Sequence, residues 1–358
     1  MDAKITKKRL SHLLSYDWIK IVAIAAAVIF VWMLIFSVTA TKITAAQQFV
    51  LVNHYSCYLG NGYNSEFYNT TDFFSYEVIE RRIEDLQSTG KSNAYTVLDA
   101  RLAVCEGDVM FIPGIDDPDT KTLVDGTGVN DIPAEYTYQS YVERFTTRYF
   151  SYVYELDKYF EQMDAFLDRY YGGDWENGER DDQKIERDFR ARVKKDNRFK
   201  TEAQRKQGVK DELQRIESYK EALGQFNEYV NDGIVAFTQS TINLYEDETI
   251  TGNYSLNICP STLVDDPNKE DANAETGGHL FQSGYSKALA DKVYYYVTDT
   301  YPDANDPEIT LSKKVKTAIN MNMIIFRYAE VGYGFQYESV LYINDLIADC
   351  IEENNKNG

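Results

Sequence analysis

The residues best arranged for ligand chemistry form a short glycine turn, Tyr171-Gly-Gly-Asp174-Trp175. Two aromatic rings and a carboxylate on one tight turn can stack on a sugar ring and hydrogen-bond its hydroxyl groups. We therefore take Tyr171, Asp174 and Trp175 as candidate ligand-binding residues for a sugar or a peptide. The alternative is a turn that ends a helix, with Trp175 packed back onto the neighbouring helices.

A second candidate surface is basic. Residues 180–220 carry 14 Lys and Arg against 9 Asp and Glu, in a chain whose net charge is −20. This local excess of positive charge favours docking of an anionic partner, such as a teichoic-acid-like polymer or an acidic loop. The alternative is a solvated helix face held by ion pairs four residues apart. The candidate docking residues are Arg190, Arg192, Lys194 and Lys195.

Residues for nucleophilic catalysis are scarce. After the first 40 residues the histidines are His54 and His279, and the motifs G-x-S-x-G, H-E-x-x-H, G-x-G-x-x-G and the phosphate loop are absent. We expect neither an enzyme nor a cofactor. A glycosidase-type hydrolase needs only two well-placed carboxylates, so an envelope hydrolase is a third and least favoured alternative.

Acidic loops are the remaining candidates for metal binding. Carboxylate oxygens are ligands that Ca²⁺ prefers, but their spacing does not match a helix-loop-helix calcium site. Calcium is therefore a minor alternative. The four cysteines are widely spaced without C-x-x-C, which is compatible with disulfides or with buried thiols. The acidic residues are Asp116, Asp117, Asp119, Asp125 and Asp131 in one loop and Asp265 and Asp266 in another; the cysteines are Cys57, Cys105, Cys259 and Cys350.

Residues 19–40 form an apolar run in which Lys20 is the only charged residue. A run of about 20 apolar residues can cross the hydrocarbon core of a bilayer as one helix. Basic residues concentrate before the run and stay on the cytoplasmic side of a membrane. We therefore expect a cytoplasmic leader at 1–18, a single lipid-embedded anchor at 19–40 and an extracellular remainder. The alternative is a signal peptide cleaved after Ala40.

The remainder of the chain is strongly acidic, because the first 40 residues contain five basic and only two acidic side chains. Such a surface is repelled by phosphate backbones. We therefore expect no nucleic-acid partner.

Hydrophobic periodicity predicts an α/β fold, with α+β as the alternative. Residues 312–328 are ambiguous between helix and strand. Strands are expected at 47–58, 108–113, 254–259 and 293–298, a turn at 61–64, and helices at 72–86, 95–105 and 336–353.

Two longer segments have helical periodicity. From Tyr138 to Tyr170, apolar positions recur at alternating steps of four and three, which predicts one helix over 134–171. A helix of roughly 35 residues would be about 50 Å long. A second helix is expected over 201–238, packed against the first as an antiparallel hairpin. The expected segments are thus 41–133 (α/β), 134–240 (helical hairpin) and 241–358 (mixed α/β, completing the base).

Residues 47–113 resemble the opening of an extracellular solute-binding protein of an ABC transporter, of the larger sugar-binding kind. The parallels are the first strand QQFVLV, a helix, and then the passage TVLDARLAVCEGDVMFIP. This last passage is similar to the end of the first βαβ unit in that family. The leader KKRLSHLLSYDWIKI also resembles single-span envelope proteins of clostridia-type bacteria. No ligand-pocket residue of the binding proteins can be matched.

The resemblance implies a solute-binding-like or accessory protein beside an ABC transporter permease. The alternative, from the basic helical segment, is a structural adaptor that docks another envelope protein. Two lobes with a cleft would favour the receptor, whereas one lobe with a projecting helical hairpin would favour the adaptor.

Overall fold

The computed structural model describes residues 18–39, 48–69, 80–87, 90–114, 141–243, 249–260, 284–302, 310–327 and 337–357. The chain divides into two compact units, Met1–Thr44 and Ala45–Gly358.

The described part of the first unit is helix α2, Trp18–Thr39. Its 22 residues give a length of about 33 Å, which matches the hydrocarbon core of a bilayer. From Trp18 to Phe36, large apolar side chains are exposed on all sides of the helix, and none of this stretch is buried inside the protein. The predicted apolar helix is confirmed, and its length and composition are consistent with a membrane anchor or a signal sequence.

The second unit is built on a mixed sheet of six strands in the order β3-β1-β4-β9-β6-β5. Strands β3 and β4 run parallel to β1 on its two sides, and β9, β6 and β5 continue the sheet with antiparallel pairing. The strands are β1 (Gln48–Asn53), β3 (Glu80–Asp85), β4 (Val109–Ile112), β5 (Ala236–Asn243), β6 (Thr249–Asn257) and β9 (Asn322–Ile325). A separate antiparallel sheet joins β2 (Tyr58–Leu59), β7 (Val293–Pro302) and β8 (Thr310–Thr317).

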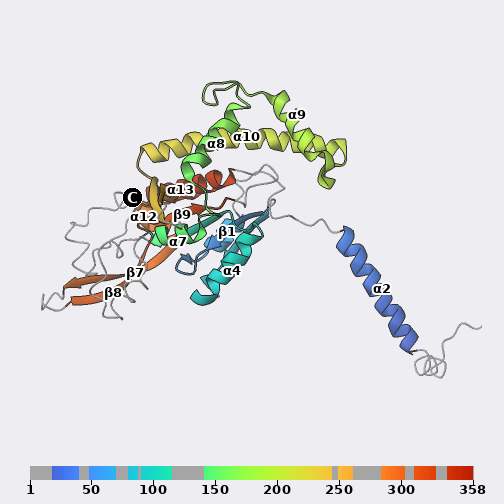
Figure 1. Ribbon diagram of the computed structural model, residues 1–358, viewed down its shortest axis with the longest axis horizontal. Helices are drawn as coiled ribbons and strands as arrows, with labels where there is room; N and C mark the ends of the chain where they lie inside the picture. The colour runs from blue at the N-terminus through green and yellow to red at the C-terminus, as the bar shows by residue number, and fades with distance from the viewer. Residues whose placement is uncertain are drawn as a thin grey trace, which may run out of the picture. The chain divides into compact units, whose positions relative to one another are not determined.

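Helices cover both faces of the larger sheet (Figure 1). Side chains alternate along β1, so Val50 and Val52 enter one core while Phe49 and Leu51 enter the other. Helices α4 (Lys91–Ala103) and α7 (Tyr141–Tyr149) pack on the first face. The second face carries α3 (Tyr63–Asn69), α8 (Leu156–Asp168), α10 (Glu202–Asn231), α12 (Gly284–Lys292) and α13 (Glu338–Asn357). The predicted α/β class is confirmed.

The predicted helix at 72–86 is wrong over its described part. Glu80–Asp85 is strand β3, and each of its residues pairs in parallel with one residue of β1. Its charged side chains suit an edge strand, where solvent reaches them, while Ile83 packs against the core. Ile79 and Ile83 lie four residues apart, an even spacing that fits a strand as well as a helix.

The predicted single helix at 134–171 is also wrong, because the chain breaks between α7 and α8. Tyr141 and Phe145 of α7 pack on one face of the sheet, whereas Leu156 and Tyr159 of α8 pack on the other. The connecting residues pass beside β9, where the Tyr154 amide donates to the Ile325 carbonyl at 3.0 Å. The residues of one heptad pattern are therefore divided between two separate hydrophobic cores.

The second long helix is shorter than predicted. Helix α10 ends at Asn231, and Gly233 then takes a φ of 71°, a left-handed conformation that terminates helices. Residues 236–238 begin β5 instead. The antiparallel pairing with α8 is confirmed by ring contacts, Phe160 with Phe226 and Phe166 with Tyr219. The ambiguous segment 312–328 contains strands, the end of β8 and all of β9.

Candidate functional site

The glycine turn joins its aromatic residues to two different helices. Tyr171 is 3% exposed, and its hydroxyl donates to Glu217 of α10 at 2.9 Å. The indole N–H of Trp175 donates to Asp164 of α8 at 2.9 Å, and its ring packs against the main core. Asp174 is exposed and accepts from the backbone of Asn177 at 3.0 Å.

These contacts match a helix-ending turn with its tryptophan packed back, since Gly172 and Gly173 have φ values of 73° and 94°. The polar tips of both rings bind groups of the protein itself. A ligand role for Tyr171, Asp174 and Trp175 stays a prediction.

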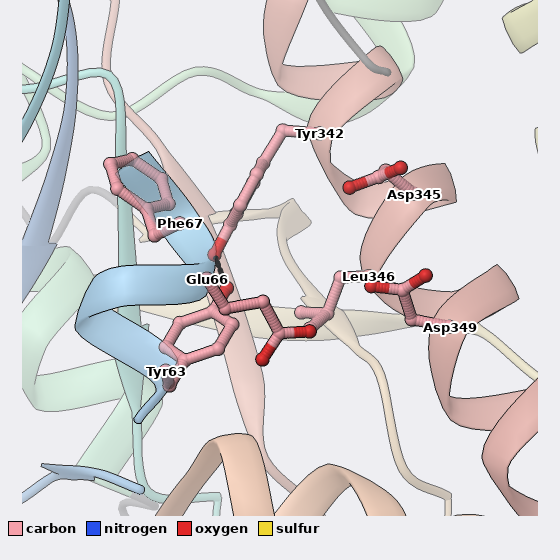
Figure 2. A pocket seen from close by; sticks show the side chains of 7 residues that line it. All are labelled: Tyr63, Glu66, Phe67, Tyr342, Asp345, Leu346 and Asp349. Carbon is pink, nitrogen blue, oxygen red and sulfur yellow. Dashed lines mark hydrogen bonds between the residues drawn. The ribbon is translucent and has the colours of Figure 1, made fainter. Parts of the chain in front are cut away.

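A hollow between α3 and α13 is lined by aromatic and acidic side chains (Figure 2). It contains about 230 Å³ of space, part of it open to solvent. The Tyr63 and Tyr342 hydroxyls hydrogen-bond to each other at 2.6 Å, and burial raises the pKa of both phenols. The other lining residues are Glu66 and Phe67 of α3 and Asp345, Leu346 and Asp349 of α13.

Two of the carboxylates that line this hollow, Glu66 and Asp349, share a lysine of the protein. The buried Lys292 ammonium pairs with Glu66, with Glu353 at 3.3 Å and with Asp349 at 3.7 Å. Burial opposes the charge, but the three carboxylates together raise the pKa of Lys292. The lysine ends α12 and so joins three helices, which identifies the cluster as a structural clamp.

Nucleophilic side chains in the described residues are mostly buried. His54 is 1% exposed, accepts from the Ser56 amide at 3.0 Å through Nδ1 and contacts the Tyr141 hydroxyl through Nε2. All four cysteines are free, and three are buried. Burial raises the pKa of Cys259 to about 12, so its thiol stays protonated at neutral pH.

No cluster of His, Cys, Asp or Glu within the described ranges could hold a metal ion. The candidate calcium loops lie outside the described residues, as does His279.

The basic segment folds as α9 (Asp182–Arg192), two short 3-10 turns (Val193–Lys195 and Asn197–Phe199) and the first turns of α10. A small core of its own holds these pieces together: Phe189, Val193 and Phe199 are buried, and Val209 packs on them. Gly208 makes the contact possible, because a Cβ there would lie 2.4 Å from the Phe189 ring. The segment is therefore a packed platform.

The two predicted docking arginines are engaged within the protein. Arg190 bonds Glu186 at 2.7 Å and Glu202 at 2.9 Å. Arg192 makes a two-point contact with the buried Glu212, at 2.8 and 3.1 Å. Burial opposes ionisation of Glu212, yet Arg215 and Arg192 hold its pKa below the ordinary value. These arginines fasten α9 to α10.

The lysines of the same segment are exposed. Lys194 and Lys195 form no ion pair with any described residue, and the same holds for three lysines that follow. Between residues 184 and 210 the chain has 11 basic and 4 acidic side chains. We call this exposed group the lysine tip: Lys194, Lys195, Lys200, Lys206 and Lys210.

The lysine tip lies where α9 joins α10, at one end of the helical layer (Figure 1). Sequence reasoning placed positive charge there but could not separate its arginines from its lysines. The pair of Arg190 with Glu186 is one of the ion pairs four residues apart that the alternative interpretation expected. The other two partners, Glu202 and Glu212, lie 12 and 20 residues away along the chain, a separation that no local pattern reveals.

Comparison with known proteins gives no relative: no family model, no curated protein and no solved structure matches the chain.

Proposed function

We propose that this chain is a membrane-anchored docking protein of the cell envelope, which binds an acidic surface of another envelope protein through its lysine tip. Helix α2 supports the anchoring, since it is long and apolar enough to cross a bilayer. The basic residues before α2 support an orientation with the N-terminus in the cytoplasm and Ala45–Gly358 outside.

The lysine tip is the observation that carries the proposal. Its ammonium groups are exposed and form no ion pair with the described residues. A partner therefore has to desolvate the lysines but does not have to break an existing ion pair. The small core under the tip fixes the positions of these charges before binding. A positive platform on an acidic protein also steers acidic partners to one orientation.

The overall organisation supports docking over a two-lobed receptor. Residues Ala45–Gly358 form a single compact unit around one large sheet. The helical segment α8-α9-α10 packs on one face of that sheet and ends in the basic platform.

Co-purification tests the proposal. Full-length tagged protein is extracted from membranes, and its partner is identified from the wild type. The triple variant K194E/K195E/K200E should lose that partner, because it turns three attractive charges into repulsive ones. The triple variant K194R/K195R/K200R keeps the charge and should retain it. Retention by the glutamate variant would reject the proposal, as would a wild type that recovers no partner.

Arg190 and Arg192 are unsuitable for this test, since their reversal would break contacts with Glu202 and Glu212 and so disturb the fold. Lys287 on α12 provides a remote control, because it is exposed and forms no ion pair with the described residues. Lys287→Glu should leave the partner bound.

A second candidate function is the solute-binding-like or accessory role beside an ABC transporter permease. The arrangement that favours it is the parallel trio β3-β1-β4, with α3 and α4 on opposite faces. A receptor should gain thermal stability with a sugar or a peptide, as mass action requires. No shift across a broad sugar and peptide library would count against this role.

A further inference from the structure

The smaller sheet has one face in the core and one face toward solvent. Side chains alternate along β7, so Val293 and Tyr295 point inward and are at most 1% exposed. The Tyr295 hydroxyl donates to the Ile319 carbonyl. Tyr294 and Tyr296 therefore share the outer face, where both are partly buried and Tyr294 also packs against the main core.

Cross-strand pairing brings two more residues to this outer face. Tyr58 of β2 is the register partner of Tyr294, and Lys316 of β8 is the register partner of Tyr296. The outer face thus presents Tyr58, Tyr294, Tyr296 and Lys316, which we call the tyrosine face. The ribbon of β7 and β8 that carries it is drawn in orange in Figure 1.

The rings of the tyrosine face are held in a defined arrangement. Tyr58 and Tyr294 stack at a centroid distance of 5.3 Å and an interplanar angle of 14°. Tyr296 stands edge-on to both, at 5.1 Å from Tyr58 and 5.4 Å from Tyr294. The Lys316 ammonium lies 4.4 Å from the Tyr294 ring centroid and 2.9 Å from an Asp291 carboxylate oxygen.

The backbone beneath these rings is also tightly fixed. The Gly60 amide donates to the Lys292 carbonyl at 2.7 Å. A Cβ on Gly60 would lie 1.5 Å from the Asp291 carbonyl oxygen, so only glycine allows β2 to approach α12 this closely. The platform is therefore preorganised, which lowers the entropy cost of binding.

We propose that the tyrosine face is a carbohydrate-binding surface, on which the rings of Tyr58 and Tyr296 stack against the sugars of a neutral glycan chain. Tyr294, which lies between Tyr58 and Lys316, supports these rings. A pyranose ring offers a flat face of C–H groups to an aromatic ring and hydroxyl groups at its rim. The phenol hydroxyls and the Lys316–Asp291 pair supply donors and acceptors for that rim.

The chemistry of this face distinguishes a glycan from other occupants. Its described outward side chains are three tyrosines and one lysine, without an aliphatic anchor of the kind that a protein interface buries. Among the described side chains of the face, the only cation, Lys316, is paired with Asp291, which weakens its attraction for a polyanion. The net charge of −20 further disfavours nucleic acid, which also stacks on aromatic rings. This surface is independent of the lysine tip.

Hydroxyl-radical footprinting of the full-length protein tests the proposal. The protein is kept in a detergent without a sugar head group, and cellohexaose, maltohexaose and chitohexaose are each added at about 1 mM. At least one of them should reduce oxidation of Tyr58 and Tyr296. Oxidation of Tyr68, an exposed tyrosine on α3, should not change. No protection of these two rings by any probe, or protection confined to other residues, overturns the proposal.

Affinity measurements on variants provide a second test. The double variant Y294A/Y296A should weaken binding of the protective probe by about tenfold or more, since it removes the Tyr296 ring and the ring on which Tyr58 stacks. Tyr68→Ala and the triple lysine-tip variant should bind as the wild type does. Unchanged affinity in a folded Y294A/Y296A protein would also overturn the proposal. The footprint on wild-type protein decides the question if that variant fails to fold.

Discussion

The burial of Glu338 predicts a pH-dependent loss of stability that one substitution removes. Glu338 begins α13 and is 2% exposed. Its Oε1 accepts from the Tyr219 hydroxyl at 2.5 Å, while its Oε2 has no hydrogen-bond partner. Burial raises the pKa of Glu338 to about 7, although Arg215 acts in the opposite direction.

The sign and size of the effect follow from proton linkage. A glutamate in the unfolded chain titrates near its ordinary pKa of 4.5. Between that pH and about 7, the folded protein therefore holds more protons than the unfolded protein, and its free energy of unfolding falls as the pH rises. At 1.36 kcal/mol per pKa unit, the full loss is about 3 kcal/mol.

Glu338→Gln keeps an acceptor for Tyr219 but cannot ionise. The variant should be more stable than the wild type by about 1 kcal/mol or less at pH 5 and by about 3 kcal/mol at pH 8. Urea titration of the compact unit that begins at Ala45 measures this, with Trp175 as its single tryptophan reporter. Glu221→Gln, at an exposed position on α10, is the matched control and should show no pH-dependent difference.

Parallel stability curves for wild type and Glu338→Gln from pH 5 to pH 8 would refute the reasoning. That result would mean that Glu338 is ionised in the folded protein throughout this range, with its charge compensated by Arg215 more fully than burial penalises it. The charge of Glu338 contributes to the raised pKa of the buried Asp108, so the difference between wild type and variant includes the coupling between these two carboxyl groups.

Three further predictions concern packing, ion pairing and the anchor. Gly208→Ala should destabilise the protein by about 1–2 kcal/mol in the same urea titration, because the added Cβ collides with the Phe189 ring. Gly224→Ala lies on the same helix, and its Cβ meets nothing within 4 Å. This second variant should stabilise the protein by up to about 1 kcal/mol. Lys292→Met should lower the unfolding free energy by about 2–4 kcal/mol by leaving three carboxylates without their shared cation; a loss under 1 kcal/mol would contradict the clamp between helices. Amino-terminal sequencing of the mature membrane-associated protein should give the start of the leader if α2 is a retained anchor, and a first residue of Thr41 would instead identify a signal peptide.

The sequence located the basic segment but did not show which of its residues are exposed and available for binding. Composition alone showed a basic segment in an acidic chain. Arg190 and Arg192 looked equivalent to Lys194 and Lys195, and only tertiary contacts separated them. Arginine side chains form two-point contacts with carboxylates, and both arginines make such contacts within the protein. The lysines remain exposed to solvent.

Periodicity predicted several elements correctly but failed for the edge strand β3 and for the segment that packs on both faces of the sheet. The strands around β1 and β4 and the helices α4 and α13 followed from local pattern. The heptad pattern that ends at Tyr170 predicted one helix, yet its first half packs on one face of the sheet and its second half on the other. The spacing of apolar residues predicts which side chains are buried, but it does not predict which surface they pack against.

The sequence by itself therefore determined the apolar α2 helix, the α/β class and the sign of the charge along the chain, because these properties depend on residue type and near neighbours. Only the tertiary structure decided which cations are already paired. It also placed Glu338 in the core and put Tyr58 beside Tyr294, which lies far along the chain. Those outcomes depend on contacts between distant segments, where burial and pairing set the energy of each side chain.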